Sequence, residues 1–126
     1  MTPKQLDELR EIARGYANFE CIDCALAMRK YLVDRGIDGN LIKISTGANL
    51  DPRNCFLYDD SVPGDAISES GYHEGICIII DGQEIAFDNH HPEGILKTEW
   101  LSNFQFFGKL HLGQELIVIA EPLRRN

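Results

Sequence analysis

The first third of the chain repeats apolar residues at the spacing of an α-helix. In residues 3–15 the apolar positions recur every three or four residues, Pro3 suits a first helical turn, and Gly15 marks the end. A second stretch of the same kind covers residues 21–35 and stops at Gly36. The pattern therefore predicts two consecutive helices at the start of the chain.

The remainder is dominated by patterns typical of β-strands. Residues 40–46 and 114–122 are short runs rich in β-branched residues. Two further runs, 72–80 and 83–89, flank an Asp-Gly dipeptide, which is a strong signal for a β-hairpin with a two-residue loop. Two helices followed mostly by strands predict an α+β domain whose N-terminal helices pack on an antiparallel β-sheet.

Less regular segments connect these elements. Residues 47–70 are rich in Gly, Pro, Asn, Asp and Ser and predict a long loop, with a short helix near 64–70. The segment HHPEG (90–94) predicts a turn, and residues 97–104 predict a short helix with Thr98 as its cap. With 126 residues, we expect the chain (1–126) to form a single domain.

Charge narrows the range of partners. The chain has 12 basic and 20 acidic side chains and a formal net charge of -8, which disfavours nucleic acid and anionic membranes as main partners. No stretch approaches the roughly 18–20 apolar residues of a membrane span, and the N-terminus is polar and periodic, unlike a signal peptide. We therefore expect a cytoplasmic protein with reduced cysteines, while export as part of a larger protein stays open.

Two of the four cysteines lie where the second helix is predicted to begin. Cys21 falls in the centre of the apolar face with Ala25, Met28 and Leu32, whereas Cys24 lies about 60° to one side. The first turn of a helix offers free backbone N–H groups and the positive end of the helix dipole. These favour a thiolate and can stabilise an oxyanion. The position therefore predicts a reactive cysteine.

The predicted hairpin supplies partners for such a cysteine. With a two-residue loop, Gly75 lies opposite Asp88, and His73 is the diagonal neighbour of Asp88 on the same face, about 7–8 Å away. Gly75 would leave room for the imidazole to lean over. A loop one residue longer would exchange Asp88 for Asn89. The pattern thus predicts that a histidine and a carboxylate or amide share one face of the sheet.

A cysteine at a helix N-terminus, a histidine and a carboxylate are the groups that thiol catalysis requires. His73 would take the proton from the thiol, and Asp88 would fix the tautomer and orientation of His73. Trp100 is expected either in the core or as a wall of the site. The order of cysteine, histidine and aspartate, with a helix before antiparallel strands, is the order of a papain-like enzyme.

Three blocks of the sequence resemble the papain-fold toxin domains of bacterial polymorphic toxin systems, specifically the second papain-fold toxin group. The blocks are FECIDCALAMRKYLVDRGIDGNLIKISTG (19–47), GYHEGICIIIDGQEIAFDNHHPEGI (71–95) and EWL (99–101). The resemblance implies a papain-like fold with a Cys-His-Asp active site. It also implies a toxin effector domain with a dedicated immunity protein as partner.

Carried over by position, that active site falls on Cys21 or Cys24, then His73 and Asp88. The helix CIDCALAMRKYL also resembles the nucleophile helix of bacterial protein-glutamine deamidases, whose single cysteine aligns with Cys21. Papain has two cysteines at this spacing and uses the second, which keeps Cys24 open. Asn18 is then a candidate for the side-chain part of the oxyanion hole.

The expected function is acyl transfer at an amide of a protein or peptide substrate, through a thioester on the cysteine. Glutamine deamidation, peptide cleavage and transglutamination share this intermediate, and deamidation or proteolysis is favoured. No metal or organic cofactor is implied.

Two alternatives stay open. One is a non-enzymatic α+β protein-binding module that uses the 47–70 loop as its contact surface. The other is a zinc-binding domain with Cys21, Cys24, His90 and His91 as ligands, although adjacent histidines lack the usual spacing. A thioredoxin-like redox pair is disfavoured, because the two cysteines precede most of the strands.

Overall fold

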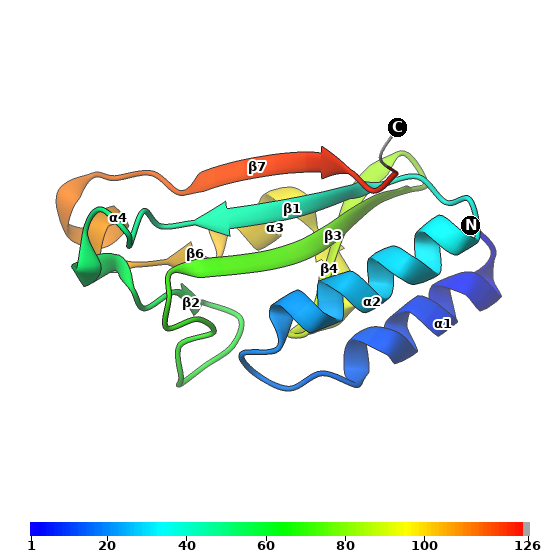
Figure 1. Cartoon of the computed structure of the whole chain (residues 1–126), viewed down its shortest axis with the longest axis horizontal. Coiled ribbons are helices and arrows are strands. Elements are labelled where there is room, and N and C mark those ends of the chain that lie inside the picture. Colours follow the sequence, from blue (N-terminus) through cyan, green and yellow to red (C-terminus); the bar gives the residue numbers. More distant parts are fainter. Residues whose placement is uncertain (125–126) are drawn as a thin grey trace.

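The computed structural model describes residues 1–124 and begins with a helical hairpin (Figure 1). Helix α1 (Pro3–Arg14) starts with a capping box, in which the Thr2 hydroxyl accepts from the Gln5 backbone and the Gln5 side chain accepts from the Thr2 backbone. Helix α2 (Cys21–Asp34) returns alongside α1, and both lie against one side of a sheet. These bounds agree with the helical periodicity of the sequence to within one residue.

Five strands of the described chain form one antiparallel sheet in the order β5-β4-β3-β1-β7. The strands are β1 (Asn40–Ser45), β3 (Tyr72–Ile80), β4 (Gln83–Asp88), β5 (His91–Leu96) and β7 (Ile117–Pro122). The β3–β4 hairpin turns at Asp81 and Gly82, whose φ angles of 51° and 80° suit a type I′ turn. Ile80 pairs with Gln83, which is the register that a two-residue loop predicts.

Shorter elements cover the far side and one end of this sheet (Figure 1). They are the 3₁₀ turn η1 (Pro52–Asn54), strands β2 (Tyr58–Asp59) and β6 (Phe104–Gln105), and helices α3 (Lys97–Ser102) and α4 (Phe107–Leu112). Strands β2 and β6 pair with each other in a second, two-stranded antiparallel sheet. None of the helices within residues 1–124 is long and apolar enough to cross a membrane.

The two faces of the five-stranded sheet carry separate buried clusters. The helix-side core lies under α1 and α2 and includes Leu9, Ala13, Cys24, Ala25, Met28, Leu32, Ile76, Ile78 and Phe87. The tryptophan-side core includes Ile42, Ile44, Leu57, Ile67, Cys77, Ala86, Trp100, Phe104 and Phe106. Alternate residues of β3 and β4 enter opposite cores, as the period of two in a strand requires. The predicted fold class, α+β with N-terminal helices on an antiparallel sheet, is confirmed.

The helix expected near residues 64–70 is wrong. The Ser68 hydroxyl accepts hydrogen bonds from the backbone N–H groups of Ser70 and Tyr72, both at 3.2 Å, and Leu57 and Ser68 form an isolated bridge. Side-chain bonds of this kind compete with the hydrogen bonds of a helix. The segment is therefore an irregular loop that is held by hydrogen bonds.

The turn expected over residues 90–94 is also wrong, because the chain reverses at Asn89 and His90 alone. The Asp88 carboxylate caps this reversal by accepting from the backbone N–H groups of His90 and His91. His91 then pairs with Asp88 and starts β5. Pro92 is tolerated in β5 because β5 is an edge strand.

The start of α3 and the start of the last strand also differ from the prediction. The N-cap of α3 is Leu96 and no side chain caps the helix, so Thr98 does not serve as the cap. The last strand begins at Ile117 and not at residue 114, because the Gln114 side chain accepts from the Asn54 amide at 2.8 Å, away from the sheet. The sequence reasoning also missed β2, β5, β6 and α4.

Candidate active site

Cys21 is the first residue of α2 and is largely buried. It is 7% exposed and lines a hollow of about 370 Å³. The backbone N–H groups in the first turn of a helix have no partner within the helix, and the N-cap residue Glu20 makes no side-chain cap to them. The thiol therefore lies beside free N–H groups and faces a space that a substrate can enter.

His73, from β3, is fully buried with its two ring nitrogens in different surroundings. Nε2 lies 2.8 Å from Oδ2 of Asp88. Nδ1 is also buried and makes no well-formed hydrogen bond within the described structure. Burial alone would lower the pKa of His73, but the hydrogen bond to Asp88 and the proximity of Cys21 outweigh burial and raise the pKa to about 9. Because Asp88 occupies Nε2, Nδ1 is the nitrogen left to interact with Cys21.

Asp88 is the last residue of β4, and each of its two carboxylate oxygens accepts two hydrogen bonds. Its Oδ2 accepts from His73 and from Nε1 of Trp100, both at 2.8 Å, and its Oδ1 accepts from the backbone of His90 and His91 at 2.9 and 2.8 Å. Burial would raise the pKa of this carboxyl, but the hydrogen bond from His73 and the nearby positive charges lower it to about 2. Asp88 is thus held ionised and in one orientation.

Aromatic side chains of α3 and β6 enclose the His73–Asp88 pair. The ring centroid of His73 lies 6.2 Å from that of Trp100 and 5.6 Å from that of Phe104. A Cβ on Gly75 would come within 2.8 Å of the Trp100 indole, so the space above Gly75 holds the indole. We expected that space for the imidazole instead. A glycine inside a strand signals close approach of a bulky group, and this signal could have predicted the contact.

Cys24 has very different surroundings from Cys21. It is 0% exposed and belongs to the helix-side core with Leu9 and Ala13 of α1. Burial, followed by nearby negative charges, raises its pKa to about 12. Cys24 does lie to one side of Cys21, as expected, but α1 covers that side. A thiol in this position is protonated and closed to substrate.

Asn89, the alternative to Asp88, and Asn18, the oxyanion candidate, both form hydrogen bonds with other parts of the chain. Asn89 donates from Nδ2 to the Ala17 carbonyl at 2.8 Å and does not bond to His73. Asn18 accepts from Nε2 of His90 at 2.9 Å and donates from Nδ2 to the Ala66 carbonyl at 3.0 Å. At most one N–H of Asn18 is left for an oxyanion.

A second histidine–carboxylate pair lies on the other side of Asp88, and the sequence reasoning missed it. Nε2 of His91 lies 2.8 Å from Oδ2 of the buried Asp59, and Ser61 donates to Oδ1 of Asp59 at 2.6 Å. Burial opposes these bonds, but they lower the pKa of Asp59 and raise the pKa of His91. No signal in the sequence places β2 beside β5, so the pair was not predictable.

The histidines and cysteines of the alternative zinc site do not come together. Within residues 1–124, no group of three or more His, Cys, Asp or Glu side chains has an arrangement that could hold a metal. His90 and His91 point their Nε2 atoms at Asn18 and Asp59 instead.

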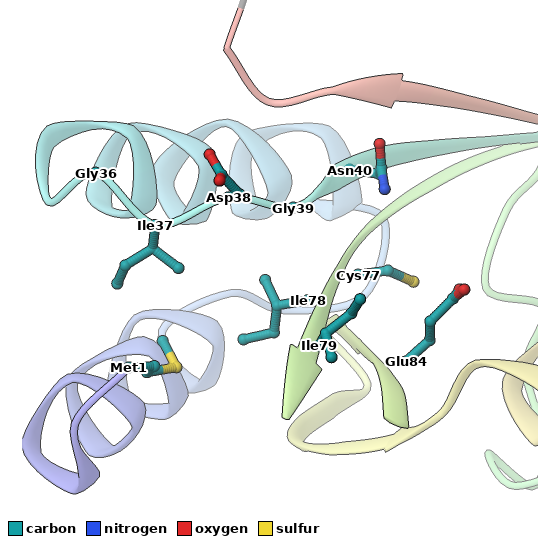
Figure 2. A pocket seen from close by; sticks show the side chains of 10 residues that line it. All are labelled: Met1, Gly36, Ile37, Asp38, Gly39, Asn40, Cys77, Ile78, Ile79 and Glu84. Atoms are coloured by element: carbon teal, nitrogen blue, oxygen red, sulfur yellow. The ribbon is translucent and has the colours of Figure 1, made fainter. Parts of the chain in front are cut away.

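A larger hollow, of about 510 Å³, lies at the opposite end of α2 (Figure 2). It is lined by Met1, Gly36, Ile37, Asp38, Gly39, Asn40, Cys77, Ile78, Ile79 and Glu84. The two carboxylates, from Asp38 and Glu84, stand apart in Figure 2, and Glu84 is paired with Lys97 at 2.9 Å. Burial raises the pKa of Cys77 to about 12, so this hollow brings no activated group to a ligand.

Comparison with known proteins gives a family for this arrangement. The family model described as papain fold toxin 2 matches residues 4–105, which run from α1 to β6 and include Cys21, His73 and Asp88. No curated protein matches the chain significantly.

Proposed function

The chain belongs to the papain fold toxin 2 family, and from this premise we propose that it is a cysteine enzyme that acts on amide bonds of proteins or peptides. The observation that carries the proposal is the buried His73, which bonds to Asp88 through Nε2 and has Nδ1 left to interact with Cys21. A histidine held by a carboxylate on one side and open to a thiol on the other is the arrangement of an activated nucleophile.

The first half-reaction forms a thioester. His73 accepts the proton of Cys21, and the Cys21 Sγ attacks the carbonyl carbon of the amide to give a tetrahedral oxyanion. The free N–H groups at the start of α2 are placed to stabilise that oxyanion. The C–N bond then breaks, and His73 returns the proton to the leaving amine or ammonia.

The second half-reaction releases the acyl group. His73 takes a proton from an incoming water molecule, whose oxygen attacks the thioester carbonyl, and Cys21 leaves as thiolate. Asp88 stays ionised throughout and stabilises the imidazolium that forms in both halves. If an amine replaces water, the product is a new amide.

The leaving group distinguishes the candidate reactions. Ammonia leaves in glutamine deamidation and a peptide amine leaves in proteolysis, and we favour these two over transglutamination. We propose that the 126 residues act as a single papain-like toxin effector domain in the cytoplasm, with export as part of a larger toxin left open. We also propose a dedicated immunity protein as its partner.

Limited alkylation tests the proposal. The native protein is treated with limiting iodoacetamide near pH 7, and the adducts are mapped by mass spectrometry. We expect Cys21 to react at least about tenfold faster than the other three cysteines, and His73→Ala to remove most of this difference because it removes the base. Uniformly slow labelling would overturn the proposal and favour a binding module instead.

Substrate screening then separates the reactions. The protein is incubated with denatured and native protein mixtures, and both free ammonia and new peptide termini are measured, with the Cys21→Ala variant as the control. Ammonia release without new termini identifies a deamidase, whereas new termini identify a protease.

A further inference from the structure

The hollow beside Cys21 has apolar side chains on its rim and floor. Phe19 and Ile22 line it and are 54% and 53% exposed, although both are large and apolar. Ile67 also lines it and is almost completely buried. Large apolar side chains that stay exposed together around a cavity mark a binding surface more often than chance. Cys21 lines the same hollow, so a ligand in the hollow lies beside Cys21.

Phe19 is held in an unfavourable backbone conformation. Its φ is 70°, in the left-handed region that residues other than glycine rarely adopt. The neighbouring Asn18 maintains this conformation, because its side chain accepts from the Phe19 backbone N–H at 3.1 Å and bonds to His90 and Ala66. Strain of this kind persists only where the surroundings impose it, and it concentrates at functional sites. The strain turns an aromatic ring to the rim of the hollow.

Another part of the hollow's wall is held by hydrogen bonds and close packing. Ser68 and Tyr72 line it, and the Ser68 hydroxyl accepts from the Tyr72 backbone at 3.2 Å. Gly71 between them has a φ of 73°, and a Cβ there would lie 2.2 Å from the Thr46 hydroxyl oxygen. A shift of this wall would break these contacts, which hold it in place.

The charge of the hollow is negative. Among the described residues that line it, Glu69 is the one charged side chain, and no lysine or arginine lines it. The formal charge of the whole chain, -8, adds to the negative field. A cationic ligand is therefore attracted to the thiol and an anionic one is repelled.

We infer that this hollow binds an apolar side chain of a cationic peptide segment, next to the residue whose amide is attacked, and that Phe19 determines this specificity. The inference rests on the proposed function, because it assigns the substrate class of the same site. Phe19 and Ile22 contact the apolar side chain, Ile67 forms the floor, and Glu69 attracts a lysine or arginine of the same segment.

A series of alkylating reagents tests the hollow without a known substrate. Iodoacetamide is compared at Cys21 with N-benzyl iodoacetamide, which adds an apolar group to the same reacting atoms. In each reaction the Sγ–carbon bond forms, iodide leaves and the thiol proton passes to His73. We expect the benzyl reagent to react at least about fivefold faster, and Phe19→Gly to bring the ratio close to one. Ile22→Ala should lower the ratio less.

Two controls separate a binding role of Phe19 from a structural one. Phe19→Gly should raise the melting temperature, because glycine relieves the positive φ, while it lowers the reagent ratio. Phe56→Ala removes another exposed aromatic ring, outside the hollow, and should leave the ratio unchanged. A ratio near one in the unmodified protein would overturn the inference, as would a ratio that survives Phe19→Gly.

Charge is tested with a cationic and an anionic methanethiosulfonate reagent of similar size. We expect the cationic reagent to modify Cys21 several-fold faster, and Glu69→Gln to reduce this preference. Equal rates, or faster modification by the anion, would overturn the cationic assignment. Both tests compare the rates of two reagents at Cys21. Failure of the proposed function would instead appear as a slow reaction of Cys21 with plain iodoacetamide, so the two failures can be told apart.

Discussion

The helix-side core and the tryptophan-side core lie on opposite faces of the same two strands, β3 and β4. The two faces bury side chains of different kinds. Under α1 and α2, the strands contribute Ile76, Ile78 and Phe87 to a cluster of apolar side chains. On the other face, the buried residues at the ends of the strands are His73 and Asp88, covered by Trp100. The tryptophan-side face thus adds an ionisable histidine–carboxylate pair to its own apolar core.

The contrast shows what distinguishes a reactive buried group from a structural one. Cys24 and His73 are both fully buried, but Cys24 lies among apolar neighbours that favour its neutral form. His73 has an ionised partner at one nitrogen, and its other nitrogen is free to face Cys21. Burial therefore opposes ionisation in both cores, and for His73 the fixed carboxylate partner outweighs it.

The largest expected effect separates the two cysteines. Cys21→Ala should abolish turnover of the substrate found by the ammonia or peptide screen and change the free energy of unfolding by less than about 1 kcal/mol. Cys24→Ala should keep turnover within about threefold and cost about 1 kcal/mol of stability, because it removes buried volume. Turnover assays and urea denaturation of both variants make the comparison.

The reverse result would exchange the two assignments. If Cys24→Ala removed turnover while Cys21→Ala kept it, the nucleophile would be the second cysteine, as in papain. The helix-side core would then have to open during the reaction.

The second effect compares one residue from each core. Asp88→Asn should lower turnover about 10²–10⁴-fold, because an amide does not hold the imidazolium of His73 as a carboxylate does. Ile76→Val, on the other face of the same hairpin, should cost about 1 kcal/mol of stability and leave turnover per folded molecule unchanged. The measurement is turnover normalised to the folded fraction by circular dichroism. Equal losses in both variants would mean that Asp88 acts only through stability.

The face and register of the hairpin were predictable because strand alternation and an Asp-Gly turn are local. They were enough to place His73 and Asp88 on one face and to prefer Asp88 over Asn89. The helix start at Cys21 was equally local. These parts of the candidate site depend only on residues that are close together in the sequence.

Other contacts of the candidate site depend on where the loops pack against the sheet. The spacing of residues in the sequence does not determine that packing. The hydrogen bond from Trp100 to Asp88 and the His91–Asp59 pair both join segments whose mutual approach is set by tertiary packing. The absence of a helix near residues 64–70 follows from the side-chain bonds of Ser68, which override local propensity.

A third, smaller effect is on stability as a function of pH. The pKa of Asp88 is lowered from 3.8 to about 2, so its contribution is present above pH 3.8 and is lost as the pH falls through 2. The pKa of His73 is raised from 6.5 to about 9, so its contribution is present below pH 6.5 and is lost as the pH rises through 9.

The fold should therefore be stabilised most by this pair between pH 3.8 and 6.5, by on the order of 2 kcal/mol. Denaturation of the unmodified protein and of Asp88→Asn from pH 3 to 9 measures the difference. A difference that does not shrink from pH 6.5 to 9 would contradict the raised pKa of His73. Ile76→Val, in the helix-side core, should show no such pH dependence relative to the unmodified protein.

The smallest effect concerns the indole that covers the pair. Trp100→Phe keeps an aromatic ring beside His73 but removes the 2.8 Å hydrogen bond from Nε1 to Oδ2 of Asp88. We expect turnover to fall about three- to tenfold, because Asp88 loses one of four donors and holds His73 less firmly. Phe104→Leu, which alters the same aromatic wall without touching Asp88, is the matched control and should change turnover less. If the two variants lose turnover equally, the wall acts by enclosing the pair and not through its hydrogen bond. In that case the chemistry on this face depends on exclusion of water more than on the orientation of Asp88.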